Sequence, residues 1–292
     1  MQKTDSGSSG PLHTQAKERA FREAYLNRSI PFLSEACLPL LKEKRVAIAG
    51  CGGVGGVVAV TLARMGIQHF HLADPGRFDL PDLNRQWAAT TKTLGRNKAQ
   101  VYREILLDIN PYADVRIWEE GLQPQNLAPF LDETDVVLDC LDLSVPLSLR
   151  ADLFELAHRQ GIFSLTAPIL GFGGMLICSD PAGNSMNLFL EILENVQKTG
   201  TLPEVLYEYL TPEHLDLISQ WLIEKRTRVP SIGVAPLVVG SLAATETLAA
   251  LVGSRLPGGR KPIALPEVVT IDLFKMKYSV VNLERVMQAQ EV

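Results

Sequence analysis

Short apolar runs alternate with longer amphipathic stretches along most of the chain. The apolar run 46–49 leads into a glycine-rich turn and a helix-like stretch that ends near Met65, which predicts a strand, a turn and a helix. The alternation continues, with strands predicted at 69–73, 115–118, 135–140, 162–165 and 175–178, and helices at 97–109, near Leu127 and at 146–159. Because parallel strands need crossover connections, this order predicts an α/β fold with a mostly parallel sheet and helices on both faces.

The beginning of the chain stands outside this alternation. Residues 1–14 are rich in Ser, Gly, Thr and Gln and hold too few apolar side chains to repay the entropy of ordering. We therefore expect a disordered tail there. The spacing of apolar residues across 15–41 predicts one or two helices, which form an N-terminal helical extension before the sheet.

A long helical segment interrupts the pattern in the second half of the chain. Residues 185–228 look helical throughout, and a further long apolar helix is predicted at 232–251, before two strands within 268–281. No linker rich in Pro, Gly or Ser divides the chain. We therefore expect residues 15–292 to form a single domain in which 185–228 is a helical insertion.

Composition narrows the classes of partner. The 292 residues include 28 Lys and Arg against 33 Asp and Glu, a formal charge of −5, and this balance does not favour binding to duplex nucleic acid. No unbroken apolar run reaches the roughly 18 residues of a membrane helix, and the N-terminus lacks the basic-then-apolar order of a signal peptide. We expect a cytoplasmic protein with no membrane partner. The cysteines form no CxxC pair, which argues against disulfides and a compact zinc site.

A glycine motif follows the first predicted strand. Gly50, Gly52 and Gly55 satisfy G-x-G-x-x-G between a strand and a helix, where glycine permits a tight turn and the helix N-terminus offers unpaired N–H groups to phosphate. Asp74 ends the second strand at the spacing where an acidic residue commonly accepts ribose hydroxyls. Together these residues predict a Rossmann-like nucleotide site.

Charged residues near this motif favour a triphosphate over a hydride carrier. The carboxyl ends of parallel strands share one edge of a sheet, so Gly50, Asp74 and Asp142 should converge, with Arg85 and Lys98 in loops above them. Two cations and a carboxylate over a phosphate-binding turn suit ATP with Mg²⁺. A nicotinamide dinucleotide needs no magnesium ligand.

Several short motifs occur in a fixed order along the chain. They are Asn27-Arg28, Gly50-x-Gly52-Gly53-x-Gly55, Asp74, Asn84-Arg85-Gln86, Gly95-x-x-Lys98, Ile109-Asn110-Pro111 and Asp139-Cys140-Leu141-Asp142. In this order they resemble the ThiF/MoeB/HesA-type adenylyltransferases, the bacterial relatives of ubiquitin-activating enzymes. The resemblance covers well over half of the chain.

The resemblance implies a role for each matching residue. Asp74 would hold the ATP ribose, Arg85 and Lys98 would bind the phosphates, and Asp142 would position Mg²⁺. Arg28, in the N-terminal helix, would reach the phosphates of the neighbouring subunit in a homodimer. The remaining cofactor-binding positions are Gly50, Gly52, Gly53, Gly55, Asn84 and Gln86.

The resemblance also implies the substrate, with departures that limit the reaction. The family activates a carboxylate, here most naturally the C-terminus of a ubiquitin-like, sulfur-carrier or peptide substrate. Many members carry two CxxC pairs for zinc and a catalytic cysteine that would fall near Thr227, and both are missing here. We therefore expect no zinc and an acyl-adenylate formed without a thioester step. The cysteines and Glu246, on the long helix 232–251, are expected to be structural.

Asp82 is a further departure, because the family usually has Asn at this position. An extra negative charge near the triphosphate would weaken ATP binding unless it is turned away or paired with Arg77.

Three other functions stay open on the sequence. The glycine motif also fits an NAD(P)-dependent oxidoreductase, although no hydride-transfer catalytic pair is evident. A non-catalytic relative could bind nucleotide or act as a scaffold, against which the intact Arg85, Lys98 and Asp142 argue. The carboxylate could also belong to a small molecule or to a modified RNA nucleoside.

Overall fold

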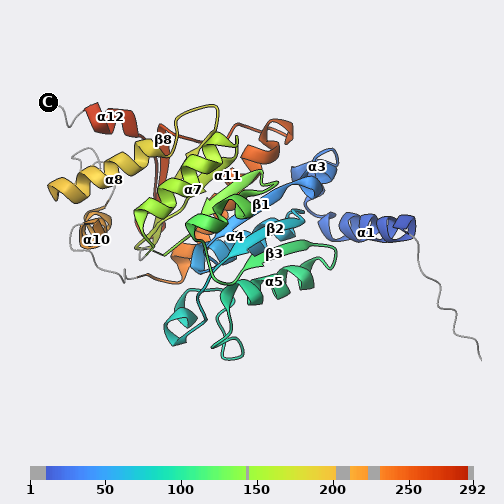
Figure 1. Ribbon diagram of the computed structural model, residues 1–292. Helices are drawn as coiled ribbons and strands as arrows, with labels where there is room; N and C mark the ends of the chain where they lie inside the picture. The colour runs from blue at the N-terminus through green and yellow to red at the C-terminus, as the bar shows by residue number, and fades with distance from the viewer. Residues whose placement is uncertain (1–10, 143–144, 202–210, 223–230, 289–292) are drawn as a thin grey trace, which may run out of the picture.

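The computed structural model describes residues 11–142, 145–201, 211–222 and 231–288, and within them a nine-stranded sheet runs through the molecule (Figure 1). Its strand order is β3-β2-β1-β4-β5-β7-β8-β9, and β6 pairs with β7. The strands are β1 (Arg45–Ala49), β2 (His69–Ala73), β3 (Asp114–Trp118), β4 (Val136–Asp139), β5 (Phe163–Thr166), β6 (Ile169–Leu170), β7 (Gly173–Ser179), β8 (Glu267–Asp272) and β9 (Lys277–Asn282).

The sheet has a parallel part and an antiparallel part. Strands β3, β2, β1, β4 and β5 pair in parallel, and β1 at the centre aligns Val46 with Phe70 on one side and with Val136 on the other. The strands from β5 to β9 pair antiparallel. The predicted α/β fold with a mostly parallel central sheet is confirmed. Strand β6 escapes prediction because two residues carry no periodicity.

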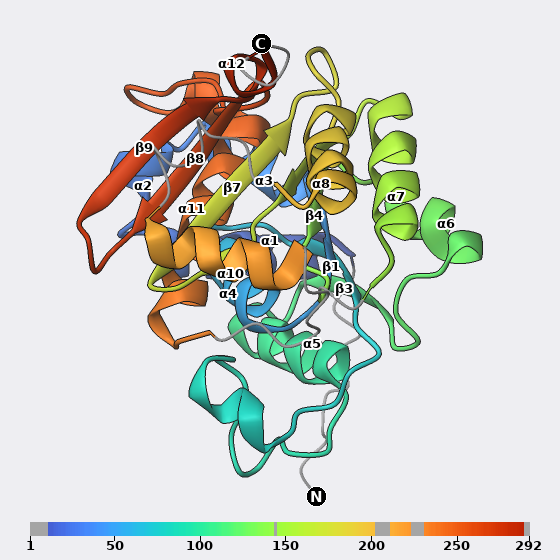
Figure 2. The same cartoon turned by 90° about the vertical axis from the view of Figure 1, so that its left-hand side faces the viewer.

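Helices cover both faces of the sheet. They are α1 (Pro11–Leu26), α2 (Ile30–Leu33), α3 (Cys37–Glu43), α4 (Gly53–Arg64), α5 (Lys98–Ile109), α6 (Leu127–Leu131), α7 (Leu147–Arg159), α8 (Asn187–Thr199), α10 (Pro212–Leu222), α11 (Val234–Val252) and α12 (Leu283–Gln288), with 3-10 turns η1 (Leu80–Asn84), η2 (Pro124–Asn126) and η3 (Gly253–Arg255). One face carries α4, packed between α11 and α5. The other carries α6 and α7, and α8 lies beside α7 (Figure 2).

Strand β1 shows how the sequence builds these layers. Val46 and Ile48 point into the core shared with α4, α5 and α11, whereas Ala47 and Ala49 point into the core shared with α6 and α7. All five residues of the strand are buried. A strand covered on both faces reads as one continuous apolar run, which is why the sequence shows no polar alternation here.

The N-terminal extension differs from the prediction in two ways. Helix α1 begins at Pro11, so the expected tail 1–14 overlaps the first turn of a helix, and residues 1–10 lie outside the described residues. Three helices rather than one or two fill 11–43, because positive φ at Ser34 and the turn at 27–29 break the segment.

The predicted insertion and the helix that follows it take up the C-terminal half. The helical prediction for 185–228 is confirmed at α8 and α10, and residues 202–210 and 223–230 lie outside the described residues. Helix α11 together with η3 is long and apolar enough to cross a membrane by composition alone. This helix is not an unbroken apolar run, because polar residues such as Thr245 and Glu246 interrupt it. Helix α11 packs against α4 and β7 in the interior.

Candidate nucleotide-binding site

The glycine turn joins β1 to α4 at the carboxyl edge of the parallel strands. Gly50 has φ +94°, and a Cβ built on it would lie 2.2 Å from the carbonyl oxygen of Cys140 at the end of β4. A Cβ on Gly55 would lie 1.9 Å from the carbonyl oxygen of Gly50. These two glycines are required by the fold itself, because no side chain fits.

Gly52 is free of that constraint. The nearest atom to a Cβ built there is the amide Nε2 of Gln86, at 3.8 Å. Gly52 is also the N-cap of α4 and provides no side-chain cap, so the first N–H groups of the helix keep their capacity for a ligand. Gly53 beside it is crowded by Pro236 of α11, 3.0 Å from its Cβ position. Gly52 therefore borders open space at the start of α4.

Asp74 connects the end of β2 to this turn. Its Oδ2 accepts a hydrogen bond from the Cys51 N–H at 2.7 Å, and its Oδ1 accepts one from the Gly76 N–H at 2.7 Å. Each carboxylate oxygen has a second lone pair, so the group retains the capacity to accept ribose hydroxyls. The predicted convergence of Gly50 and Asp74 is confirmed, since the Gly50 N–H bonds to the Ala73 carbonyl at 2.8 Å.

The two predicted phosphate-binding cations meet at a buried acid. Lys98 Nζ lies 3.1 Å from Asp82 Oδ2, and Arg85 Nη2 lies 3.6 Å from Asp82 Oδ1. Asp82 is therefore paired, as expected for an acid near a triphosphate site, but the expected partner Arg77 was wrong: its partners are Lys98 and Arg85. Arg77 donates to the Gly95 carbonyl oxygen at 2.8 Å instead.

This cluster lies against the glycine turn. The Gln86 amide faces Gly52, and the carbonyl oxygen of Arg85 lies 3.8 Å from the Cβ position of Gly53. The Lys98 side chain passes 3.5 Å from the Cβ position of Gly76. The helix that presents Lys98 is capped by Asn97, whose side chain accepts from the Gln100 N–H.

Asn84 and Gln86 flank Arg85 and have different surroundings. Asn84 is exposed; its Oδ1 accepts from Arg85 Nη1 at 3.1 Å and its Nδ2 donates to the Ser231 carbonyl at 3.4 Å. Gln86 is buried and donates to Asp82, while its Oε1 has no hydrogen-bond partner among the described residues. Asn84 thus supports Arg85 and the start of α11, and Gln86 holds an acceptor ready beside Gly52.

Asp142 lies on the loop after β4, at the same edge of the sheet, with an exposed side chain. The loop is held by Arg150 of α7, which donates to Asp139 Oδ2 at 2.5 Å, to the Leu141 carbonyl at 2.8 Å and to the Asp142 carbonyl at 2.6 Å. Sequence reasoning missed Arg150. Its signal was an arginine on the buried face of an amphipathic helix, where a charge needs a partner.

No group of three or more His, Cys, Asp or Glu gathers into a metal site within the described ranges. Mg²⁺ is commonly held by one or two carboxylates together with substrate phosphates, so the exposed Asp142 at this edge of the sheet fits such an ion. Closed zinc sites need four protein ligands.

The cysteines Cys37, Cys51 and Cys178 are buried, and Cys140 is half-buried. Burial raises the pKa of the Cys51, Cys140 and Cys178 thiols, and Cys37 is buried in the core. A protonated thiol is a poor nucleophile, and these positions suit a structural role. Glu246 is also structural, since it is fully buried and pairs with Arg260 while accepting from the Ile263 N–H at 2.8 Å.

Arg28 is the predicted residue that lies apart from the others. It is exposed in the turn 27–29 after α1, not inside the helix as expected. Arg22 ties α1 to the Gly66 carbonyl and to Gln68, just before β2 begins, so Arg28 lies toward the amino edge of the strands. The site in this subunit is built at the opposite edge, without Arg28.

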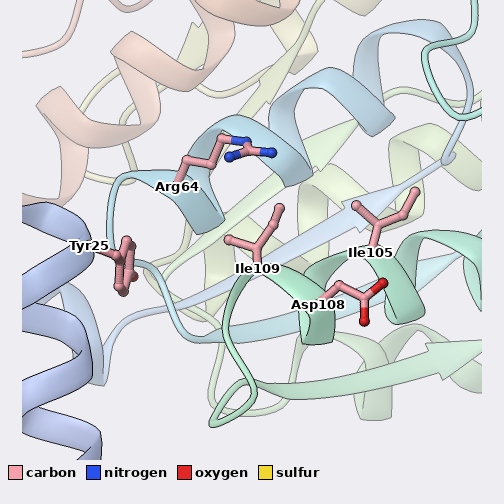
Figure 3. A pocket seen from close by; sticks show the side chains of 5 residues that line it. All are labelled: Tyr25, Arg64, Ile105, Asp108 and Ile109. Carbon is pink, nitrogen blue, oxygen red and sulfur yellow. The ribbon is translucent and has the colours of Figure 1, made fainter.

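A hollow between α1, α4 and α5 is lined by Tyr25, Arg64, Ile105, Asp108 and Ile109 (Figure 3). These residues lie at the carboxyl ends of all three helices. Because α4 and α5 run back across the sheet from the glycine edge, the hollow lies away from the candidate site.

Comparison with known proteins identifies relatives of the chain. It is 27% identical over 266 residues to tRNA threonylcarbamoyladenosine dehydratase 1 of Saccharomyces cerevisiae, covering 82% of this chain and 60% of that protein. It is 32% identical over 141 residues to the sulfur carrier protein ThiS adenylyltransferase of Escherichia coli, covering 48% and 55%. It is 27% identical over 239 residues to the molybdopterin-synthase adenylyltransferase of Escherichia coli, covering 81% and 84%. The chain thus spans 60% and 55% of the length of the first two of these relatives.

Solved structures share the fold. A crystal structure of PaaA matches with TM-score 0.64 and 15% identity, covering 97% of this chain and 86% of that one. A crystal structure of Escherichia coli MccB with ATP matches with TM-score 0.62 and 20% identity, covering 84% and 65%. The model of the ThiF family matches residues 26–291, nearly the whole chain. The chain belongs to the ThiF family.

Proposed function

We propose that the protein is an ATP- and Mg²⁺-dependent adenylyltransferase that activates a carboxylate as an acyl-adenylate. The observation that carries the proposal is the gathering of Lys98, Arg85 and Gln86 against the open Gly52 position, with Asp74 beside the same turn. Two curated relatives are named as adenylyltransferases, which supports this activity over an oxidoreductase built on the same turn.

The reaction places simple demands on the protein. An acceptor carboxylate oxygen attacks the α-phosphorus of ATP, the bond to the bridging oxygen breaks, and pyrophosphate leaves with the electron pair. A carboxylate is already ionised at neutral pH, so no general base is needed. The protein must align the reactants and neutralise charge on the phosphates.

The residues at the sheet edge divide these tasks. Lys98 and Arg85 supply positive charge, and the N–H groups of α4 beyond Gly52 bind phosphate oxygens. Asp74 accepts from the ribose. Asp142 would hold Mg²⁺, which supplies charge neutralisation on the phosphates when bound.

The acceptor proposed is the C-terminus of a ubiquitin-like, sulfur-carrier or peptide substrate, passed on without a thioester step. The names of the ThiS and molybdopterin-synthase relatives support the first two classes. The protonated cysteines support direct transfer of the adenylate to another nucleophile. The working protein is proposed to be a cytoplasmic homodimer in which Arg28 of one subunit reaches the phosphates in the other.

A second candidate substrate is a modified tRNA nucleoside. It is favoured by the relative that aligns over 82% of this chain, which is named a tRNA threonylcarbamoyladenosine dehydratase. Threonylcarbamoyladenosine carries a carboxylate, so the same first step of adenylation applies.

Exchange of labelled pyrophosphate into ATP tests the proposal. The wild-type protein is expected to catalyse exchange only when a suitable carboxylate acceptor from the three classes is present. Asp142→Ala should lower exchange by about 100-fold or more, since a metal contact made in the transition state is lost, with an unchanged melting temperature. Absence of exchange with every acceptor would favour a non-catalytic, nucleotide-binding relative.

A further inference from the structure

Asp82 is the most buried member of the cluster that it forms with Lys98 and Arg85. Its side chain is 7% exposed, whereas those of Lys98 and Arg85 are 14% and 26% exposed. Turn η1 fixes the carboxylate, because Asp82 Oδ2 accepts from the Asp79 N–H at 3.2 Å and the Asp79 side chain caps the Asp82 backbone in return. The acid is therefore part of a rigid turn and does not reach outward like the cations.

The two cations both turn their charge toward this acid. Lys98 Nζ lies 3.1 Å from one carboxylate oxygen, and Arg85 Nη2 lies 3.6 Å from the other. The cluster of Lys98, Arg85 and Asp82 thus carries a net charge of about +1 instead of +2. A phosphate that binds Lys98 or Arg85 must share the cation with Asp82 or displace it.

Gln86 shows that the cluster is arranged toward a ligand. Its Nε2 must be the atom that faces Asp82, because a carboxylate only accepts hydrogen bonds. Its Oε1 lies 3.9 Å from the Cβ position of Gly52, about as near as Nε2 at 3.8 Å, and it is buried and without a hydrogen-bond partner among the described residues. A buried acceptor without a partner calls for a donor such as a ribose hydroxyl, because ionised phosphate oxygens only accept hydrogen bonds.

We propose that Asp82 is an internal counter-ion of the phosphate subsite, a positioning residue that competes with phosphate for Lys98 and Arg85 and so weakens binding of the triphosphate and of released pyrophosphate. This role of Asp82 rests on the proposed function only in taking ATP as the source of the phosphates. The negative charge is not needed for the turn, since the side-chain oxygen of Asn at this position could accept the same hydrogen bond from the Asp79 N–H.

Asp82→Asn tests the competition, with inorganic tripolyphosphate as the probe. At an effective dielectric constant of about 20 to 40, removal of a unit charge on the order of 7 Å from a phosphate should tighten binding about 10- to 50-fold. Calorimetric titration of the intact protein measures this. The affinity of the variant should also fall more steeply with salt, since the subsite gains one net positive charge.

Asp79→Asn is the matched control. It removes a negative charge from the same turn, keeps a side-chain oxygen for the cap, and the charge lies on an exposed residue with no ion pair to Lys98 or Arg85 among the described residues. Its affinity for tripolyphosphate should stay within about twofold of the wild type, because exposed charges are well screened.

The direction in which Asp82→Asn changes the affinity for tripolyphosphate distinguishes competition with phosphate from a purely structural role of Asp82. If Asp82 only held Lys98 and Arg85 in place, Asp82→Asn would bind tripolyphosphate as weakly as the wild type or more weakly, and that result overturns the proposal. The same holds if neither protein binds the probe. Tight binding by the variant in a protein that shows no pyrophosphate exchange would refute the proposed function and leave the role of Asp82 standing.

A measurement on the wild-type protein guards against a variant that fails to fold. In a crystal structure with tripolyphosphate, Lys98 Nζ or Arg85 Nη2 should contact a phosphate oxygen, and its contact with Asp82 should be longer than in the free protein. Phosphates bound elsewhere, with both ion pairs unchanged, would contradict the proposal. In the active enzyme, Asp82→Asn should lower the KM for ATP and strengthen inhibition by pyrophosphate by similar factors, without raising kcat.

Discussion

Gly52 offers a sharp separation of folding from ligand binding. A methyl group added at Gly52 meets only the Gln86 amide, at 3.8 Å, and φ there is −82°, outside the left-handed range that requires glycine. The Gly52→Ala protein should therefore fold normally. The same methyl group lies in the space from which phosphate oxygens would approach the start of α4.

The expected effects on the free energy of unfolding and on ATP binding differ enough to be measured separately. Loss of a glycine N-cap and reduced freedom of the unfolded chain nearly cancel, so Gly52→Ala should change the free energy of unfolding by less than about 1 kcal/mol. Crowding of a bound phosphate should cost about 1–3 kcal/mol, which weakens ATP binding about 5- to 150-fold. Gly55→Ala would place Cβ 1.9 Å from the Gly50 carbonyl oxygen. This clash should destabilise the fold by about 3 kcal/mol or more.

Urea unfolding and calorimetric titration with MgATP are the two assays. Gly52→Ala should keep the midpoint of unfolding and lose affinity, whereas Gly55→Ala should unfold at much lower urea. Wild-type ATP affinity in a folded Gly52→Ala protein would refute the assignment of this turn as the phosphate site.

Three further predictions concern other parts of the molecule. Burial lowers the pKa of His71 to about 4. Between pH 7 and pH 5 the histidine is therefore protonated in the unfolded chain but not in the folded protein, which lowers the free energy of unfolding by about 2 kcal/mol. Urea unfolding should show this loss, and His71→Gln should remove it. Glu246→Ala leaves the Ile263 N–H without its acceptor and should lower the free energy of unfolding by about 2–4 kcal/mol with MgATP affinity unchanged. If Arg28 acts in the partner subunit, mixing inactive Arg28→Ala and Asp142→Ala proteins should restore about a quarter of wild-type exchange, since random pairing of subunits completes one site in four. No recovery in dimers shown to exchange subunits would refute the action of Arg28 in the partner's site.

Most of the fold could be predicted from the alternation of strands and helices, because strands that are buried on both faces form continuous apolar runs in the sequence. The run 46–49 became β1, and the long apolar helix expected at 232–251 became α11. What escaped prediction depends on contacts between distant residues. Strand β6 is two residues that pair with β7, too short to show a pattern, and α1 begins at Pro11 despite the poor apolar content of its first turn.

The candidate site was also predictable only in part. The glycine turn and Asp74 were predictable because their spacing follows from a strand, a turn and a helix. The partner of Asp82 was not, since Arg77 lies nearer in the sequence than Lys98, and only the folding of η1 against α5 brings Lys98 to it. Arg150 was missed for a similar reason: its three acceptors lie on β4 and its loop, a separate element from its own helix.

The adenylate itself gives the most direct test of the proposed activity. An acceptor that supports pyrophosphate exchange is incubated with MgATP and the wild-type protein, and the acid-quenched mixture is analysed by mass spectrometry. We predict an AMP adduct on the acceptor carboxylate, which is absent when Lys98→Met replaces the wild type. Loss of the adduct with intact folding would support the phosphate site, whereas an adduct formed equally well by Lys98→Met would contradict it.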